Sequence, residues 1–499
     1  MTAIITQSLK SQLLRTIFDE NEGVLPGDSN NNYYIAIGRS QQWQAEDNTD
    51  LVPDPASTER EERLFRYNMQ SVKAAEGYSY VVPLYDWTAN TQYQAFNDNV
   101  VGHPAQSYYV RTSDNNVYMC LRTGKNDAGI TQVSTQKPDH TTTALPIETD
   151  GYVWKYLYTI STADANKFLT TAFMPLKYVD SDAAVADPTQ ASQWEVAKAA
   201  VAGQVIGYRV TEGGGPYTSP PAITVRGNGT GATARAILSS TGSIAAIEVD
   251  DSDGSGNKAS DTPYASNTYL TGRNDGTAPD GGYGFGRNYD YADVTISSAS
   301  LSAGGTAAKA VPIFGPKAGL GADVRDDLRA LSFMFNIKPE GTVSDKWVID
   351  QGYRQIGILR NPLDSAQGNL FTGTQGIGLN RMTLTTPAGD GNVSNGYAIS
   401  FDQDTKITGG TSSAIAWLDY YDDSSTIWYH QDETTGFGAF QDGENITVEG
   451  YSASTLTLDS ALVAPDFDVY SGDLLFINNF TEVTRDPDQT EDIKVVIKL

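Results

Sequence analysis

The stretch DGYVWKYLYTI at residues 150–160 does most to decide the fold of this chain. Side chains in a β-strand alternate between two faces, so one face of this segment is entirely aromatic. That face carries Tyr152, Trp154, Tyr156 and Tyr158. Val153, Leu157 and the aliphatic stem of Lys155 fill the other face. The pattern predicts a strand buried on both sides in a β-rich core, and a stacking platform for sugars or bases is the alternative with the same residues.

Size and charge limit the classes of protein to which the chain can belong. With 499 residues the chain exceeds the size of one hydrophobic core, so we expect two or more domains. Asp and Glu number 61 against 34 Lys and Arg, which gives a net charge of −27. This excess repels a phosphate backbone, and we see no basic stripe to offset it. We therefore expect no nucleic acid partner.

Cysteine use and hydropathy bear on the compartment. Cys120 is the single cysteine, which excludes intrachain disulfides and indicates synthesis in a reducing compartment. Lys10 and Arg15 interrupt the apolar residues of the first 18, unlike a secretory signal. No apolar run reaches the ~18 residues that a transmembrane helix needs. We expect a protein made in cytosol-like solution, with no membrane partner.

The periodicity of apolar residues predicts a mainly β fold with few helices. Helices are expected at residues 2–21, where Leu9 and Leu13 share an apolar side, and at 59–75. Short strands are expected at 33–37, 78–84, 107–111, 117–122 and 152–160. Clusters of Asn, Asp, Gly and Pro separate these strands. The fold class we expect is a β-sandwich core with a few helices.

Two glycine-rich segments interrupt this pattern and are interpreted as inserted β modules, at residues 202–322 and 367–470. The core is then expected to comprise residues 1–201, 323–366 and 471–499. Within the first insertion, residues 208–236 are partly echoed by 294–310, which suggests two related β units. A weaker relative of the same pattern occurs at 409–417.

The residues that most enzymes use are scarce. The three histidines, His103, His140 and His430, lack the spacing of a zinc helix and have no cysteine partners. No phosphate-binding loop occurs, and the Gly284-Phe285-Gly286 segment is not flanked by a strand and a helix. We therefore expect no cofactor, no metal and no catalytic residues.

Two acidic stretches leave alternatives open. DSDGSGN at 251–257 imitates the start of a calcium loop, but Thr262 stands at the twelfth position, where a bidentate Glu is needed. A hydrated turn is the favoured interpretation. The aspartates between 402 and 432 could include a glycosidase pair, but solvated loop tips are the favoured explanation.

Four segments, in order along the chain, carry a resemblance to a known family. They are YIAIGRSQQW at 34–43, the aromatic strand at 150–160, GYRQIGILRNPL at 352–363 and DQTEDIKVVI at 488–497, with SGDL at 471–474 before the last. The set resembles the baseplate wedge subunit of T-even-like contractile-tailed bacteriophages, the gene product eight family. The resemblance covers about half of the chain, namely 1–200, 323–366 and 471–499.

The resemblance implies a structural, non-enzymatic protein of the virion, located in the tail baseplate after assembly in the host cytoplasm. It implies a homodimer that bridges other wedge proteins and transmits the rearrangement that triggers sheath contraction. The family offers no catalytic residues. Residue types in the shared segments nominate structural or interface positions, which are Gly38, Arg39, Trp43, Trp154, Arg354, Asn361 and Pro362.

A function of another class stays open beside this one. The chain has 28 Tyr and 7 Trp on a β-rich scaffold, a composition compatible with a carbohydrate-binding or carbohydrate-cleaving tail adhesion protein. Trp417 and Trp428 are the candidate contacts for a glycan. The two insertions are also candidates for contact with the host surface while the core remains structural.

Overall fold

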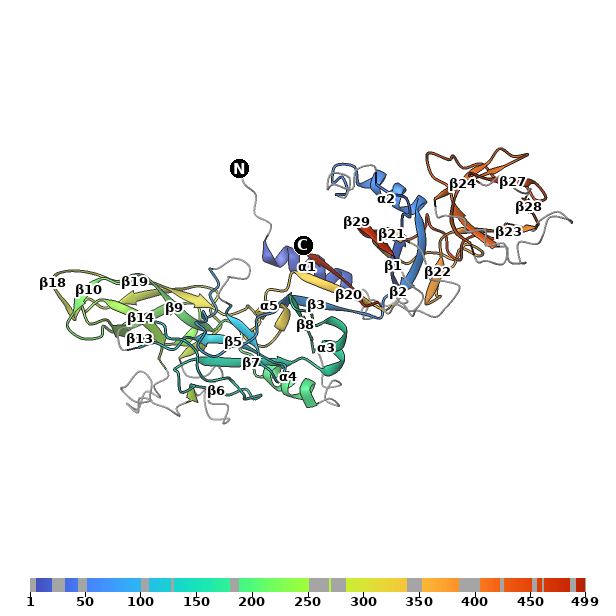
Figure 1. Ribbon diagram of the computed structural model, residues 1–499. Coiled ribbons are helices and arrows are strands. Elements are labelled where there is room, and N and C mark those ends of the chain that lie inside the picture. Colours follow the sequence, from blue (N-terminus) through green and yellow to red (C-terminus); the bar gives the residue numbers. More distant parts are fainter. Residues whose placement is uncertain are drawn as a thin grey trace. The chain divides into compact units, whose positions relative to one another are not determined.

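The computed structural model of the protein describes fourteen segments of the chain. They are residues 6–19, 32–43, 52–99, 107–126, 130–179, 188–250, 269–270, 284–338, 352–385, 404–421, 426–450, 456–459, 462–484 and 491–498. Strands make up 46% of the structure and helices 10%, and the sheets are antiparallel (Figure 1). The predicted mainly β fold is confirmed.

The chain forms two compact units. Unit 1 comprises residues 1–15, 79–334 and 496–499, and unit 2 comprises 16–78 and 335–495. The residues that the sequence assigned to one core, 1–201, 323–366 and 471–499, are divided between these units.

The aromatic stretch forms β7 (Val153–Thr159) at one edge of a three-stranded sheet in unit 1, after β4 (Tyr109–Arg111) and β5 (Asn116–Arg122). Its rings are buried, and helix α4 (Pro188–Lys198) packs against the strand. Burial of both faces follows from the apolar side chains on each, and the Tyr hydroxyls find partners; that of Tyr158 donates to the carbonyl of Pro175.

The first glycine-rich segment folds in unit 1 as nested antiparallel pairs. The pairs are β9 (Val205–Glu212) with β19 (Lys309–Phe314), β10 (Gly215–Tyr217) with β18 (Leu301–Thr306), β11 (Ile223–Gly227) with β17 (Ala292–Ile296), and β12 (Thr230–Ala232) with β16 (Phe285–Arg287). A hairpin of β13 (Ala234–Leu238) and β14 (Ile244–Val249) lies between them in sequence. The echoing segments 208–236 and 294–310 are therefore partners within one module rather than two separate units.

The chain also forms a four-stranded sheet and several short elements. A four-stranded sheet has the order β30-β20-β3-β8, with bounds Ile493–Lys498, Ser332–Ile337, Gly77–Pro83 and Phe173–Leu176. The boundary between the units falls inside its first three strands. The other elements are α1 (Gln7–Asp19), α3 (Thr162–Phe168), α5 (Val324–Asp327) and the pair of β6 (Leu145–Pro146) with β15 (Tyr269–Leu270).

Unit 2 is built on a five-stranded sheet whose strands are distant in sequence. Its order is β22-β2-β1-β21-β29, with bounds Gln375–Ile377, Met69–Ala74, Tyr33–Gly38, Gly352–Arg360 and Asp473–Thr484. Alternate residues of β1 supply the two faces: Tyr34 and Ala36 join one cluster and Ile37 the other. Helix α2 (Thr58–Tyr67) covers the first cluster with Phe65, whose ring occupies the space above Gly357 that a side chain would need.

The second glycine-rich segment contains a closed six-stranded barrel. Its strands, in barrel order, are β23 (Asn380–Thr385), β26 (Thr426–His430), β25 (Ile415–Tyr421), β24 (Thr405–Gly409), β27 (Asn445–Val448) and β28 (Leu456–Leu458). The barrel has its own core, in which Ile407, Ala416 and Ile427 are fully buried. Closure pairs each of the six strands on both sides, so the barrel leaves no unpaired sheet edge.

The two expected helices differ from the sequence prediction in their bounds or in the side that is buried. The helix expected at 59–75 ends at Tyr67, and residues 69–74 form β2 instead, because pairing with β1 and β22 outweighs their helical propensity. The first helix is present, but Leu9 and Leu13 are exposed and Leu14 is the buried residue. The calcium-like stretch at 251–262 lies outside the described residues.

Candidate functional site

At the end of β1 the backbone approaches a neighbouring strand closely and then takes a conformation that is unusual for a residue other than glycine. A Cβ on Gly38 would lie 2.7 Å from the carbonyl oxygen of Asn68, so glycine allows the chains to approach here. Arg39 has a φ of 59°, in the left-handed region that non-glycine residues rarely adopt. Its backbone N–H donates to the same Asn68 oxygen at 2.9 Å. The chain is thereby turned out of the sheet at a fixed point.

Arg39 and Trp43 meet directly after this turn. The guanidinium carbon of Arg39 lies 3.9 Å from the centroid of the Trp43 ring, a cation–π contact. The indole Nε1 of Trp43 donates to the carbonyl of Phe480 in β29 at 3.0 Å. The segment after β1 is therefore attached to a strand more than 400 residues further along the chain.

Arg354 joins this group from β21. It is buried, and its guanidinium donates to the carbonyl of Ser40 and forms an ion pair with Glu482 at 3.0 Å. The structure thus brings together Gly38, Arg39, Trp43 and Arg354 around one end of the sheet. Their donors are engaged within the protein, so they act as braces.

A buried polar triad links the same place to the barrel. The hydroxyl of Ser40 donates to Oδ1 of Asp419 at 3.2 Å, and Nδ1 of His430 lies 2.6 Å from Oδ2 of Asp419. Burial alone lowers the pKa of His430, but the charges of Asp419, Asp432 and Asp404 outweigh it, so the net shift is upward. Local sequence spacing does not predict this contact, since Ser40 and Asp419 are 379 residues apart.

The triad has the residue types of a hydrolase but not its arrangement. Nucleophilic catalysis needs the serine hydroxyl bonded to the histidine, so that the imidazole can take its proton. Here Ser40 bonds to Asp419, and Nε2 of His430 lies 3.5 Å from the side-chain amide nitrogen of Gln41. The arrangement stabilises a junction and does not activate a nucleophile.

Asn361 and Pro362 lie at the opposite end of β21. Asn361 has a φ of 50°, and its Oδ1 accepts a hydrogen bond from the backbone N–H of Asn32 at 2.8 Å. The carbonyl of Pro362 accepts from the N–H of Phe371 at 2.8 Å. The pair ends the strand and fixes the following loop.

Trp154 belongs to the core of unit 1. It is fully buried and stacks on Tyr152, with ring centroids 5.7 Å apart and an interplanar angle of 10°. Tyr93 contacts it edge-on at 5.4 Å. Of the two interpretations of the aromatic strand, the buried core strand is confirmed and an open stacking platform is excluded by the burial of its rings.

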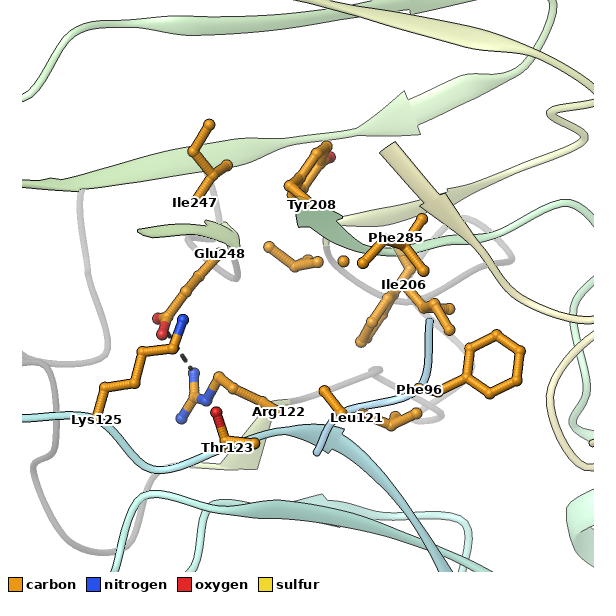
Figure 2. A pocket seen from close by; sticks show the side chains of 14 residues that line it. Phe96, Leu121, Arg122, Thr123, Lys125, Ile206, Tyr208, Ile247, Glu248 and Phe285 are labelled. Carbon is orange, nitrogen blue, oxygen red and sulfur yellow. Dashed lines mark ion pairs between the residues drawn. The ribbon is translucent and has the colours of Figure 1, made fainter. Parts of the chain in front are cut away.

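A pocket of about 90 Å³ separates the three-stranded sheet from the nested module in unit 1 (Figure 2). Glu248 of β14 lies at its polar end with Arg122 of β5 and Lys125, opposite apolar residues such as Phe285. Oε2 of Glu248 lies 3.2 Å from Arg235 and 3.7 Å from Arg122. Burial lowers the pKa of Lys125. One carboxylate thus joins Arg235 of its own hairpin to Arg122 of the sheet, and the pair with Arg122 attaches the module.

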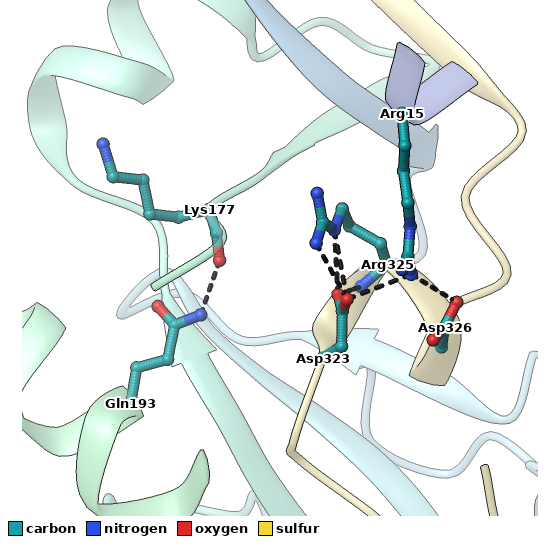
Figure 3. A network of polar contacts seen from close by, with 6 residues as sticks. All are labelled: Arg15, Lys177, Gln193, Asp323, Arg325 and Asp326. Carbon is teal, nitrogen blue, oxygen red and sulfur yellow. Dashed lines mark hydrogen bonds and ion pairs between the residues drawn. The ribbon is translucent and has the colours of Figure 1, made fainter. Parts of the chain in front are cut away.

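A second polar network holds α1 to unit 1 (Figure 3). Arg15 lies 3.0 Å from Asp323 and 2.8 Å from Asp326, which precede and occupy α5. Asp323 also pairs with Arg325, and the guanidinium of Arg325 covers the ring of Tyr178 at 3.8 Å. Nearby, the side-chain amide of Gln193 donates to the carbonyl of Lys177. The two ion pairs of Arg15 hold one side of α1 in place, and Leu9 and Leu13 are exposed on the other side.

In the described part of the chain, no group of three His, Cys, Asp or Glu residues is placed to bind a metal ion. No helix among the described residues is long and apolar enough to cross a membrane. No protein-family model and no curated protein matches this chain.

Proposed function

We propose that this protein is a structural, non-enzymatic subunit of a phage tail baseplate wedge. It bridges neighbouring wedge proteins and transmits the rearrangement that triggers sheath contraction. The observation that supports this proposal is the adjacency of β1, β21 and β29. Three of the segments that carry the family resemblance, 34–43, 352–363 and 471–474, contribute to these neighbouring strands. Two of the four segments, with the stretch at 471–474, therefore meet in one sheet of unit 2, while the aromatic strand belongs to unit 1.

The braces at the end of β1 suit a mechanical role. A sheet closed by strands from distant parts of the chain keeps its geometry only while all of them are paired, so a displacement of one strand is passed to the others. Arg354, Trp43 and Asp419 add polar bonds between the sheet, the segment after β1 and the barrel. Such cross-bracing serves transmission of force between partners.

The proposed partners are a second copy of the chain and other wedge proteins, in the virion tail baseplate after assembly in the host cytoplasm. Helix α1 offers a surface for the second copy. Leu9 and Leu13, one turn apart, are 47% and 53% exposed, which is costly unless a partner covers them. We assign this side of α1 to the homodimer contact.

The dimer is tested by analytical ultracentrifugation of the purified protein at micromolar concentration. The wild-type protein is expected to sediment as a dimer and the double variant Leu9→Asp, Leu13→Asp as a monomer with an unchanged circular dichroism spectrum. The double variant Leu9→Met, Leu13→Met keeps both side chains apolar, is the matched control and stays dimeric. A wild-type protein that is monomeric at all concentrations counts against the proposal.

The role in assembly is tested by deleting the gene from its phage and supplying it in trans. Without the protein, we expect infected cells to accumulate no complete contractile tails, and complementation to restore them. Normal tails that lack the protein would refute the structural role, and normal tails with lost adsorption would favour the carbohydrate-binding adhesion function instead.

A further inference from the structure

Three aromatic side chains whose rings are inclined to one another lie together in unit 2 and are here called the platform. Tyr67 at the end of α2 contacts Phe437 and Tyr470, with ring centroids 5.1 and 6.2 Å apart. Phe437 is 56% exposed and Tyr470 is 58% exposed. Large aromatic groups side by side at the surface lose the free energy of burial, so such a cluster marks a site that a ligand covers.

The platform borders a groove of about 410 Å³, a size in the range of ligand-binding pockets. Polar residues share its lining with the rings, among them Asp364, Asp468 and Asn380. Oδ1 of Asp364 and of Asp468 accepts bonds from neighbouring backbone N–H groups. The groove thus combines apolar ring faces with carboxylate and amide groups.

The loop that carries Tyr470 is held in place by the side chain of Arg66. Arg66 is buried, and its guanidinium donates to the carbonyls of Val469, Ser471 and Gly472, each at 2.8 Å. Both sides of Tyr470 are therefore fixed. An exposed ring on a fixed loop is a preorganised contact, because binding costs it little conformational entropy.

The loop that carries Phe437 is braced in the same way. Nε2 of Gln431 donates to the carbonyls of Ile415 and Gly438, each at 2.8 Å, so the loop is tied to the barrel on both sides of the ring. Oδ1 of Asp432 accepts from the backbone N–H of Thr434 at 2.8 Å. Two separate loops, each held by hydrogen bonds, thus present Phe437 and Tyr470 at the border of the groove.

We propose that this groove binds a neutral oligosaccharide. The C–H faces of sugar rings stack on aromatic rings, and sugar hydroxyls donate to carboxylate and amide oxygens of the kind found at Asp364, Asp468 and Asn380. The two aspartates, in a chain with a net charge of −27, disfavour acidic sugars and nucleic acid. Trp417 and Trp428, the contacts expected from sequence, are not part of this groove. Sugar binding at this groove goes beyond the proposed structural function and is tested independently of it.

The test is binding of the purified full-length protein to an array of glucose-, galactose- and mannose-based oligosaccharides and their sialylated counterparts, followed by calorimetry with the strongest binder. A neutral oligosaccharide is expected to bind. Phe437→Ala and Tyr470→Ala should each weaken binding about tenfold or more, with an unchanged melting temperature. Tyr470→Phe keeps the ring and should retain most of the affinity. Tyr291→Ala removes a 66% exposed ring in unit 1 and is the matched control.

Several results overturn the inference. They are no binding to any array member, a preference for sialylated sugars, and neutral binding that survives both alanine variants. Variants that leave sugar binding intact but change the sedimentation of the protein would assign the platform to a protein contact instead. None of these results bears on whether the protein is present in assembled tails, so the structural proposal is tested independently.

Discussion

The two glycine-rich parts of the chain are attached to their surroundings by buried polar groups of different chemistry. The nested module of unit 1 is attached through Glu248, between Arg122 and Arg235. The barrel of unit 2 is attached through Asp419, between Ser40 and His430. The arginines stay charged at all ordinary pH values, whereas the histidine titrates. Two segments of similar composition therefore differ in their attachment. The ion pair of Glu248 with Arg122 keeps its charges over the ordinary pH range, whereas the contact of Asp419 with His430 responds to pH.

The two regions also differ in their internal stability. The barrel closes on itself around a continuous core, while the nested module is built from short two-stranded sheets. A short pair of strands is marginal alone, so the module depends more on its attachment than the barrel does. We therefore expect the nested module to lose stability with its attachment, and the barrel to lose stability with its core.

The largest effect is expected for Glu248→Ala. The substitution leaves Arg122 and Arg235 without their shared carboxylate in a buried place, and should lower the free energy of unfolding of unit 1 by about 3–5 kcal/mol. Urea denaturation measures the loss, and hydrogen exchange should show it first in residues 205–249. Glu212→Ala removes an exposed pair with Lys309 of the same module and should cost less than about 1 kcal/mol. Equal losses in both variants would show that Glu248 does not attach the module.

A core substitution in the barrel should act locally. Ile407→Ala removes a fully buried side chain from the barrel core and should cost about 2–5 kcal/mol. Faster hydrogen exchange is expected in residues 405–448, with little change in the five-stranded sheet. Thr408→Ala, its half-buried neighbour, is the control. If exchange rose equally in β1 and β21, the barrel would not be a separately stabilised region.

The attachment of the barrel should weaken as pH rises. The folded-state pKa of His430 lies above its ordinary value of 6.5, so its stabilising contribution is complete below about pH 6.5 and is lost as pH rises through the folded-state pKa. Burial raises the pKa of Glu148 to about 7, so this group reduces stability as pH rises from about 4.5 to about 7, mostly below the range in which His430 acts.

The comparison of wild type with His430→Gln therefore isolates the histidine. Thermal unfolding between about pH 6 and pH 9 should show a decline in wild-type stability that is smaller in the variant. A parallel decline in both proteins would show that the His430–Asp419 pair is not the sensitive attachment.

The smallest effect is expected for Trp43→Phe. The variant keeps an aromatic ring for Arg39 but loses the indole hydrogen bond to the carbonyl of Phe480, which should cost about 0.5–1.5 kcal/mol. Chemical denaturation of unit 2 measures it. A loss as large as that of Ile407→Ala would mean that Trp43 acts through packing rather than through this bond.

Some of this structure was predictable from local pattern and some was not. The aromatic strand was, because a period of two with apolar residues on both faces describes a buried strand without knowledge of its partners. Residues 69–74 were not, because the same residues suit a helix until β1 and β22 pair with them.

The sites depend on partners that are distant in sequence. Gly38, Arg39, Trp43 and Arg354 could be nominated by residue type, but their meeting place follows from the pairing of β1 with β21. His430 and the aspartates between 402 and 432 could be named from the sequence, but their contact with Ser40 could not, and the aromatic platform of Tyr67, Phe437 and Tyr470 was not predicted. Folding brings together residues that no local spacing relates.

The decisive experiment is an electron cryomicroscopy reconstruction of the assembled phage tail, with this chain fitted into the density. As a wedge subunit, the protein should appear as a dimer in every wedge around the tail hub, with β1, β21 and β29 in one continuous sheet. Density for the chain only in a peripheral fibre or receptor-binding tip, or its absence from the tail, would refute the structural function.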